Sequence, residues 1–308
     1  MTLIFSLQKM INPSNLVTVR DFIRYAATTF AEHDIDLGQG TESNFDEACF
    51  LILRSLSLPL NSLDIFLDAR LAPEEISHCM KHIKARAKER IPAAYVLNEA
   101  WLRDFKFYVN EDVLIPRSHI ADIIFDQKDV WFPESRAINS ILDLCTGSGC
   151  LAILAAHHFR GASVVASDIS RSALQVCHKN ITSYDLEQAI TSLESDLFSN
   201  IHNKFDLIIS NPPYVDQCAM SQLPIEFRKE PELALAGGEE GVDLIQKIIK
   251  QATHHLNTEG ILLMEVGRDR EVIEKMFPKI PFTWIETPSG HDFVFLVTRE
   301  ELCLGLAD

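Results

Sequence analysis

The spacing of apolar residues changes twice along the chain and divides it into three segments. From about residue 18 to 92 apolar residues recur every third or fourth position, as Val19, Phe22, Ile23 and Ala26 do, which predicts helices. Aromatic and β-branched residues separated by polar breaks then follow from Tyr95 to Ile115, which indicates a β-hairpin. We therefore expect a small helical domain over residues 1–93, a hairpin linker over 94–118 and a larger domain over 119–308.

The helical segment also contains local signals for where helices begin. Asn44 and Glu47 have the spacing of a capping box ahead of an apolar stretch, and Pro73 is placed to open a later helix. These signals support separate helices in this segment.

The larger domain alternates between apolar strands and helical stretches. Such alternation predicts an α/β fold whose mostly parallel sheet is covered by helices on both faces, with an antiparallel edge formed by the last two strands. The expected strands are Ile138–Leu144, Ser163–Ser167, Phe205–Ser210, Gly260–Val266, Phe282–Glu286 and Phe293–Thr298, with a further strand presumed before Asp196.

The first of these strands runs into a glycine-rich loop over residues 143–150. Gly147 and Gly149 allow the backbone to approach a ligand closely and to turn sharply into a helix. About twenty residues later Asp168 ends the next strand, where a carboxylate can accept hydrogen bonds from ribose hydroxyls. The same spacing, with Ala152, also fits the dinucleotide fingerprint, so a dinucleotide site and a purely structural turn remain alternatives.

Two further acids favour S-adenosylmethionine as the ligand of this loop. Asp143, at the strand end, would face the amino group of a methionine moiety and would oppose a pyrophosphate. Asp196, after the presumed third strand, is placed to meet an adenine amino group. We therefore expect a methyl donor here rather than a dinucleotide.

The motif Asn211-Pro212-Pro213-Tyr214 directly follows the strand 205–210. A planar amide or exocyclic amine is a poor nucleophile because its lone pair is delocalised. The side-chain oxygen of Asn211 and the carbonyl of Pro212 can both accept hydrogen bonds from such an NH2 group, and prolines supply no competing N–H. Tyr214 offers a flat face to the planar group. The motif predicts methyl transfer to an NH2 nitrogen, catalysed mainly by positioning.

The charge balance helps to choose between an amide in a protein and an amine in nucleic acid. The formal net charge is -16, and residues 117–308 carry 16 basic against 28 acidic side chains. The segment 216–243 after the motif has a local balance of -5. Because nucleic-acid affinity depends on neutralising phosphates, we expect no stable nucleic-acid binding and a basic protein partner instead. Methylation of a flipped base remains the alternative.

Taken together, these motifs make the chain resemble the protein-glutamine methyltransferases of the HemK/PrmC and PrmB group. The resemblance covers nearly the whole chain, and also includes Leu114-Ile115-Pro116-Arg117. Within the group the chain is more similar to the PrmB branch, since Ser118 follows Arg117 where the release-factor branch typically has proline. Further features of that branch lie at Tyr214-Val215-Asp216, 220–224, 228–233 and Phe282-Thr283-Trp284.

The resemblance implies a Rossmann-like methyltransferase domain with a mostly parallel seven-stranded sheet, preceded by a helical domain for substrate recognition. It implies methyl transfer to a glutamine of ribosomal large-subunit protein number three; the same reaction on a release factor, and an assembly factor without turnover, are the rivals. The glutamine would be held by Asn211 to Tyr214. The cofactor would be held by Asp143, Cys145, Thr146, Gly147, Ser148, Gly149, Asp168, Ile169, Asp196, Leu197 and Asn211.

At three positions the sequence departs from the family pattern or leaves the role of the residue open. Cys145 stands where the family commonly has glycine, which makes the loop more crowded. Leu197 stands where the pattern can have tryptophan, beside the adenine. Arg117 is open between orienting a ligand and acting as a hinge.

Other residues predict no metal site, disulfide or membrane segment. The seven cysteines are scattered without a Cys-x-x-Cys, and His78 and His82 lack a third ligand. The longest apolar runs fall short of the ~20 residues that a membrane span needs, and residues 1–10 do not have the pattern of a signal peptide. We expect a cytoplasmic protein that uses no metal.

Overall fold

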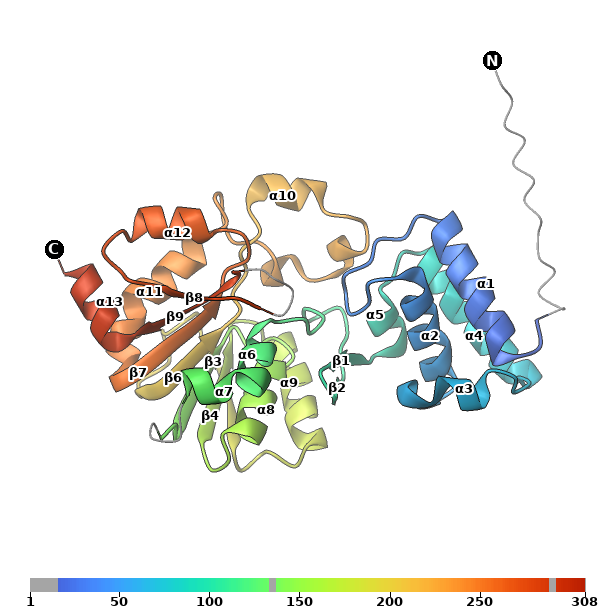
Figure 1. The fold of residues 1–308 in the computed structure, drawn as a ribbon, viewed down its shortest axis with the longest axis horizontal. Helices are drawn as coiled ribbons and strands as arrows, with labels where there is room; N and C mark the ends of the chain where they lie inside the picture. The colour runs from blue at the N-terminus through green and yellow to red at the C-terminus, as the bar shows by residue number, and fades with distance from the viewer. Residues whose placement is uncertain (1–15, 133–136, 288–291, 308) are drawn as a thin grey trace, which may run out of the picture. The chain divides into compact units, whose positions relative to one another are not determined.

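The computed structural model describes residues 16–132, 137–287 and 292–307 (Figure 1). Residues 1–10, for which no signal peptide is expected, lie outside this range. The chain divides into two compact units, one ending at Leu97 and one beginning at Asn98.

The first unit is helical. Its helices bury their apolar faces around a core that includes Phe22, Phe30, Leu51 and Ile83. The helices are α1 (Val19–Glu32), α2 (Asn44–Ser55), α3 (Leu63–Phe66), α4 (Pro73–Ala87) and α5 (Ala93–Leu97), with a 3-10 turn at Leu60–Ser62.

Two local expectations for this part of the chain are wrong. The cap of α2 is Ser43, whose side chain accepts a hydrogen bond from the Asp46 backbone N–H, so the expected Asn44–Glu47 capping box does not form. Glu47 is buried instead and pairs with the buried Arg86. Tyr95 and Val96, expected in the hairpin, lie in α5. Aromatic and β-branched residues favour strands, but this preference depends on context and does not exclude a helix. Here the backbone N–H groups of both residues are bonded within one helical turn.

The second unit opens with the hairpin, which is shorter than expected. Strands β1 (Ala100–Leu102) and β2 (Phe105–Phe107) pair antiparallel, and Arg103 in the turn between them has a left-handed φ of 55°.

A seven-stranded sheet follows, in the order β5-β4-β3-β6-β7-β9-β8. Strands β5, β4, β3, β6 and β7 are parallel, and β9 and β8 form an antiparallel edge. The expected fold class is therefore confirmed. The strands are β3 (Ser140–Leu144), β4 (Ser163–Asp168), β5 (Ile190–Glu194), β6 (Phe205–Ser210), β7 (Leu256–Glu265), β8 (Thr283–Ile285) and β9 (Val294–Thr298).

Helices cover both faces of this sheet (Figure 1). Alternate residues of β3, Leu142 and Leu144, face a core that they share with Ile245, Ile273 and Leu302 from α11, α12 and α13. The opposite face is covered by α6, α8 and α9. The helices of this unit are α6 (Ile120–Asp126), α7 (Lys128–Trp131), α8 (Cys150–His158), α9 (Arg171–Ser183), α10 (Gln217–Gln222), α11 (Asp243–His255), α12 (Arg270–Met276) and α13 (Arg299–Leu306), with 3-10 turns at Phe227–Lys229 and Glu232–Ala234.

The strand order brings the predicted motifs to one edge of the sheet. β3 lies between β4 and β6, and Leu144 is in register with Ser167 on one side and Ser210 on the other. The glycine loop, Asp168 and Asn211 therefore all follow adjacent carboxyl ends. This is the point of reversed strand order where open α/β sheets bind ligands.

Candidate active site

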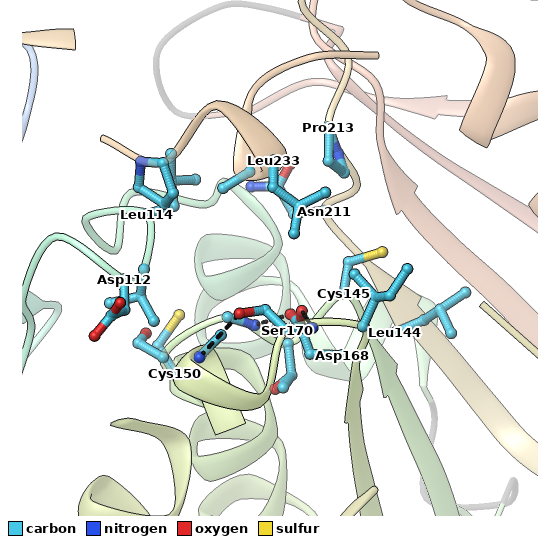
Figure 2. Close-up of a pocket in the computed structure, with 18 of the residues that line it drawn as sticks. Asp112, Leu114, Leu144, Cys145, Cys150, Asp168, Ser170, Asn211, Pro213 and Leu233 are labelled. Atoms are coloured by element: carbon cyan, nitrogen blue, oxygen red, sulfur yellow. Dashed lines mark hydrogen bonds between the residues drawn. The ribbon is translucent and has the colours of Figure 1, made fainter. Parts of the chain in front are cut away.

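A cavity of about 380 Å³ lies at this edge of the sheet. Figure 2 shows Asn211 and Pro213 across it from Asp168 and Ser170, with Cys145 between them. Its walls come from residues in the segments 111–118, 144–151, 168–173, 195–197, 211–213 and 231–234, together with Leu244. The predicted cofactor loop and Asn211 thus line one cavity.

The glycine loop has the backbone that its sequence predicts. Gly147 and Gly149 have left-handed φ values of 55° and 81°, and Gly149 caps α8. A Cβ at Gly149 would lie 2.6 Å from the Sγ atom of Cys177, so this position has no room for a side chain. Cys145 is left-handed too, at 62°, which gives a physical reason for the glycine that the family commonly has there.

Asp168 holds the loop and also lines the cavity. One carboxylate oxygen accepts the Gly147 backbone N–H at 2.9 Å, and the other accepts the Ser170 N–H at 2.9 Å. Burial raises the pKa of Asp168 above its ordinary value. Each oxygen has a second lone pair, so the carboxylate can still accept hydrogen bonds from a ligand in the cavity.

Asp143 does not line the cavity, contrary to the expectation that it faces a ligand amino group. Its carboxylate is 1% exposed and accepts hydrogen bonds from the Thr146 hydroxyl and the Ala152 backbone N–H. Burial raises the pKa of Asp143 to about 7, against the effect of these two donors. Because residue 143 points to the α8 face of β3, its carboxylate fastens the loop to α8.

Gly149 is not among the residues that line the cavity. The other predicted cofactor residues do line it: Cys145, Thr146, Gly147, Ser148, Ile169, Asp196 and Leu197. Ile169 is 49% exposed at the mouth, and Asp196 is exposed. Leu197 is buried in a left-handed turn, where the Ser195 hydroxyl donates to the Leu197 carbonyl at 2.6 Å. These residues face a ligand from the side of β4 and β5.

The Asn-Pro-Pro-Tyr motif contributes unequally to the wall. Asn211 and Pro213 line the cavity, whereas Pro212 and Tyr214 are not among its lining residues. The hydroxyl of Tyr214 donates to Glu265 at 3.4 Å, and its ring packs so closely on Gly267 that a Cβ there would lie 2.7 Å from Cε2. Burial and the charge of Glu265 raise the pKa of Tyr214 above its ordinary value. The expected flat face for a substrate amide is therefore not presented to the cavity.

Two buried glutamates beside the motif were not predicted. The Glu230 carboxylate accepts hydrogen bonds from both η nitrogens of Arg117, at 2.6 and 2.8 Å. It also accepts one from the Ile115 backbone N–H, at 3.0 Å. Glu265 accepts the Ser118 hydroxyl at 2.6 Å and the His119 backbone N–H at 2.9 Å. Each acid fixes part of the segment 115–119 against an element more than a hundred residues away.

These contacts also settle where the side chain of Arg117 goes. The guanidinium is paired with Glu230 and lies 5.5 Å from the centre of the Phe227 ring. Arg117 therefore lines the cavity, and its charge is paired with Glu230 within the wall.

The acidic segment 216–243 is less charged on its surface than its sequence indicates. Glu226 and Glu230 are buried, so they do not present the surface charge that we expected to attract a basic partner. Exposed acids remain at Glu232, Glu239, Glu240 and Asp243. A sequence count cannot separate charges that pair internally from charges that face solvent.

The charges around the cavity distinguish between the candidate ligands. Among its described lining residues, the acids are Glu111, Asp112, Asp168 and Asp196, and the single cation is Arg117, which is paired with Glu230. A cavity without an available cation favours a positively charged ligand and disfavours a pyrophosphate.

The histidine pair in α4, considered as metal ligands, does not form a second candidate site. His82 is half-buried and its Nδ1 atom lies 2.7 Å from the Ser55 hydroxyl; burial lowers the pKa of His82 to about 4. Over the described ranges, no group of three or more potential metal ligands is found. In the same residues no single helix is long and apolar enough to cross a membrane; α2 and the Leu60–Phe66 segment meet the length and composition only as a pair bent by 102°.

Comparison with known proteins decides the family. A model of the methyltransferase small domain matches residues 131–227. A protein of Neisseria meningitidis serogroup B, named ribosomal protein uL3 glutamine methyltransferase, is 46% identical over 287 residues, which cover 93% of this chain and 95% of that protein. A protein of Burkholderia pseudomallei with the same name is 42% identical over 299 residues, covering 94% and 97%. The chain belongs to the ribosomal protein uL3 glutamine methyltransferase family.

This membership confirms the resemblance that the sequence motifs predicted. Among solved structures, a ribosomal protein L11 methylase from Lactobacillus delbrueckii subsp. bulgaricus matches with a TM-score of 0.40 at 20% identity, covering 58% of this chain and 75% of that one. The relatives at 42–46% identity and the matching domain model show that the chain is a methyltransferase.

Proposed function

We propose that this protein transfers a methyl group from S-adenosylmethionine to the side-chain amide nitrogen of a glutamine in ribosomal protein uL3, the substrate in its relatives' name. The observation that carries the proposal is that Asn211 and residues Cys145, Thr146, Gly147 and Ser148 of the loop line the same cavity. The reaction needs a group that holds the nucleophile and a loop that holds the cofactor in one cavity.

The residues of the cavity fit S-adenosylmethionine. Its amino group and sulfur are positively charged, which suits a wall that carries acids and no available cation. Asp168 and Asp196 would accept hydrogen bonds from the ribose and the adenine amino group. Ile169 and Leu197 would pack against the base, and the residues from Cys145 to Gly149 would hold the methionine portion. When bound there, S-adenosylmethionine supplies an electrophilic methyl group.

Asn211 carries the substrate side of the reaction. Its side-chain oxygen accepts a hydrogen bond from the glutamine NH2, which directs the nitrogen lone pair toward the methyl group. Pro212, expected to supply the second acceptor, is not among the residues that line the cavity. The backbone of Pro213 completes the wall, and Tyr214 acts as a positioning residue through Glu265. The methylated nitrogen then loses a proton to water, so no strong base is required and orientation supplies most of the rate.

The partner we propose is the free, basic ribosomal protein in the cytoplasm, with no stable nucleic-acid binding and no bound metal. The exposed acids Glu232, Glu239 and Glu240 support a basic partner. We propose that the helical unit also contributes to recognition, because it exposes Phe45 and Ile65, the latter at 77%. Ile65→Ser should raise KM for uL3 and leave KM for S-adenosylmethionine unchanged; an unaltered KM for uL3 would remove this role.

The direct test is transfer of a labelled methyl group to purified uL3, to a peptide chain release factor and to ribosomal RNA in parallel. We expect label on uL3 alone, at a glutamine identified by fragmentation of the labelled peptide. Label on the release factor or on RNA, with none on uL3, would contradict the proposal and point to the corresponding rival.

A further inference from the structure

Asn180 of α9 joins two separate walls of the cavity through one buried side chain. It is 1% exposed. Its Nδ2 atom donates to the Ser148 carbonyl at 2.8 Å, in the glycine loop, and to the Tyr108 carbonyl at 3.0 Å. Its Oδ1 atom accepts the Tyr108 backbone N–H at 2.7 Å. Both amide donors and the acceptor are therefore engaged.

The contact between Asn180 and Tyr108 is one of two described places where a side chain from the α9 region binds the backbone at the hairpin. At Tyr184, the residue that follows the last residue of α9, the hydroxyl accepts the Lys106 backbone N–H at 2.8 Å and donates to the Lys106 carbonyl at 2.9 Å. Residues 106 and 108 present their backbone groups on the same edge of the chain, away from β1. One side chain of α9 and one that directly follows it thus bind the backbone of the hairpin, and of these two Asn180 also reaches the glycine loop.

Only two residues, 109 and 110, separate Tyr108 from the cavity wall, and hydrogen bonds hold this short segment in place. Val109 is buried and its carbonyl accepts the Asn98 side-chain amide at 3.0 Å. The Asn110 side chain bonds the backbone N–H and the carboxylate of Asp112. Because Glu111, Asp112, Val113 and Leu114 line the cavity, a shift at Tyr108 is carried directly to this wall.

We propose that Asn180 is a positioning residue that couples the cofactor loop to the wall formed by residues 111–114. A ligand that fixes the loop fixes the Ser148 carbonyl, and through the single amide of Asn180 it also fixes Tyr108 and the wall that follows. Coupling between two subsites is reciprocal, so a substrate that orders the wall also favours the cofactor-bound loop. The inference rests on the proposed use of this cavity for S-adenosylmethionine.

The test is hydrogen exchange of the full chain with and without S-adenosylhomocysteine, read for the backbone of residues 145–152 and 108–114. In the native protein we expect the ligand to slow exchange in both segments. In Asn180→Ala the loop should keep its ligand-dependent protection, while the protection of 108–114 is lost. Asn180→Ser, whose shorter side chain cannot span the Ser148 carbonyl and the Tyr108 backbone together, should give the same result and serves if the alanine variant does not fold.

Tyr184→Phe is the matched control, since it loosens the hairpin at Lys106 and leaves the Asn180 bridge intact. It should retain ligand-dependent protection of 108–114. We also expect S-adenosylhomocysteine to bind about tenfold more weakly to Asn180→Ala and within about twofold of native to Tyr184→Phe, since only the former loses a buried hydrogen bond to the loop.

The outcomes separate this inference from the proposed function. Binding of S-adenosylhomocysteine to the native protein without protection of 108–114, or protection that persists in both Asn180 variants, overturns the coupling alone. A native protein that does not bind S-adenosylhomocysteine overturns the proposed function as well.

Discussion

Removing Arg117 should strongly destabilise the second unit, because it leaves the buried Glu230 carboxylate without its cation. In Arg117→Ala, Glu230 loses both guanidinium hydrogen bonds and keeps the Ile115 backbone N–H as its remaining described partner. The side chain of Glu230 is fully inaccessible, and that of Arg117 is 24% exposed. Breaking a buried ion pair from one side costs about 3–5 kcal/mol, so we expect a loss near the lower end of that range.

The assay can follow the second unit separately from the helical one. All three tryptophans, Trp101, Trp131 and Trp284, lie beyond residue 97. Urea unfolding monitored by tryptophan fluorescence therefore reports the free energy of unfolding of this unit. Arg171→Ala provides the control, since the Arg171–Glu194 pair is exposed and such pairs contribute about 0–1 kcal/mol.

A double variant separates the ion pair from the volume of its side chains. Arg117→Met with Glu230→Gln removes both charges and keeps a side-chain oxygen that can accept the Ile115 backbone N–H, so it should recover most of the stability that Arg117→Ala loses. A loss below about 1 kcal/mol in Arg117→Ala, equal to that of the Arg171 control, would refute the reasoning that Glu230 depends on this pair.

Three further predictions concern the loop, the motif and the surface. Burial raises the pKa of Asp143 from 3.8 to about 7, so the folded protein holds this proton more tightly than the unfolded chain. The protonated carboxyl therefore adds to stability below about pH 4, and this contribution is lost as the pH rises through about 7. Asp143→Asn should flatten that slope in urea midpoints compared between about pH 5 and about pH 8, and an unchanged slope would contradict it. Tyr214→Phe keeps the ring on Gly267 but removes the hydroxyl from Glu265, so kcat should fall about tenfold with KM for S-adenosylmethionine unchanged; a native kcat would exclude this positioning role. Neutralising Glu232, Glu239 and Glu240 to glutamine should raise KM for uL3 several-fold at low salt and little at high salt, whereas Glu271→Gln on α12 should change neither; equal KM values at low salt would argue against steering.

The fold followed from the sequence because its signals are local. Alternation of strands and helices fixed the order of elements, and parallel strands then had to bring the glycine loop, Asp168 and Asn211 to one edge. The left-handed glycines and the Asn-Pro-Pro turn are each specified within a few residues, so their place in the site was predictable.

The supporting contacts were not predictable, because each joins distant parts of the chain. Ser118 meets Glu265 across 147 positions, and Asn180 meets Tyr108 across 72. Nothing near Glu226 or Glu230 in the sequence marks these acids as buried, so they counted as surface charge. Asp143 was misplaced for a related reason: its position at a strand end was correct, but which face of the sheet it pointed to depended on register.

The most direct test of the account is to measure cofactor binding and methyl transfer together in Asn211→Ala. If Asn211 holds the glutamine amide, this variant should bind S-adenosylhomocysteine nearly as the native protein does and transfer methyl groups to uL3 at least about a hundredfold more slowly. Asn203→Ala, at an exposed position outside the cavity, should match the native protein in both measurements. Native turnover in Asn211→Ala would contradict the central claim.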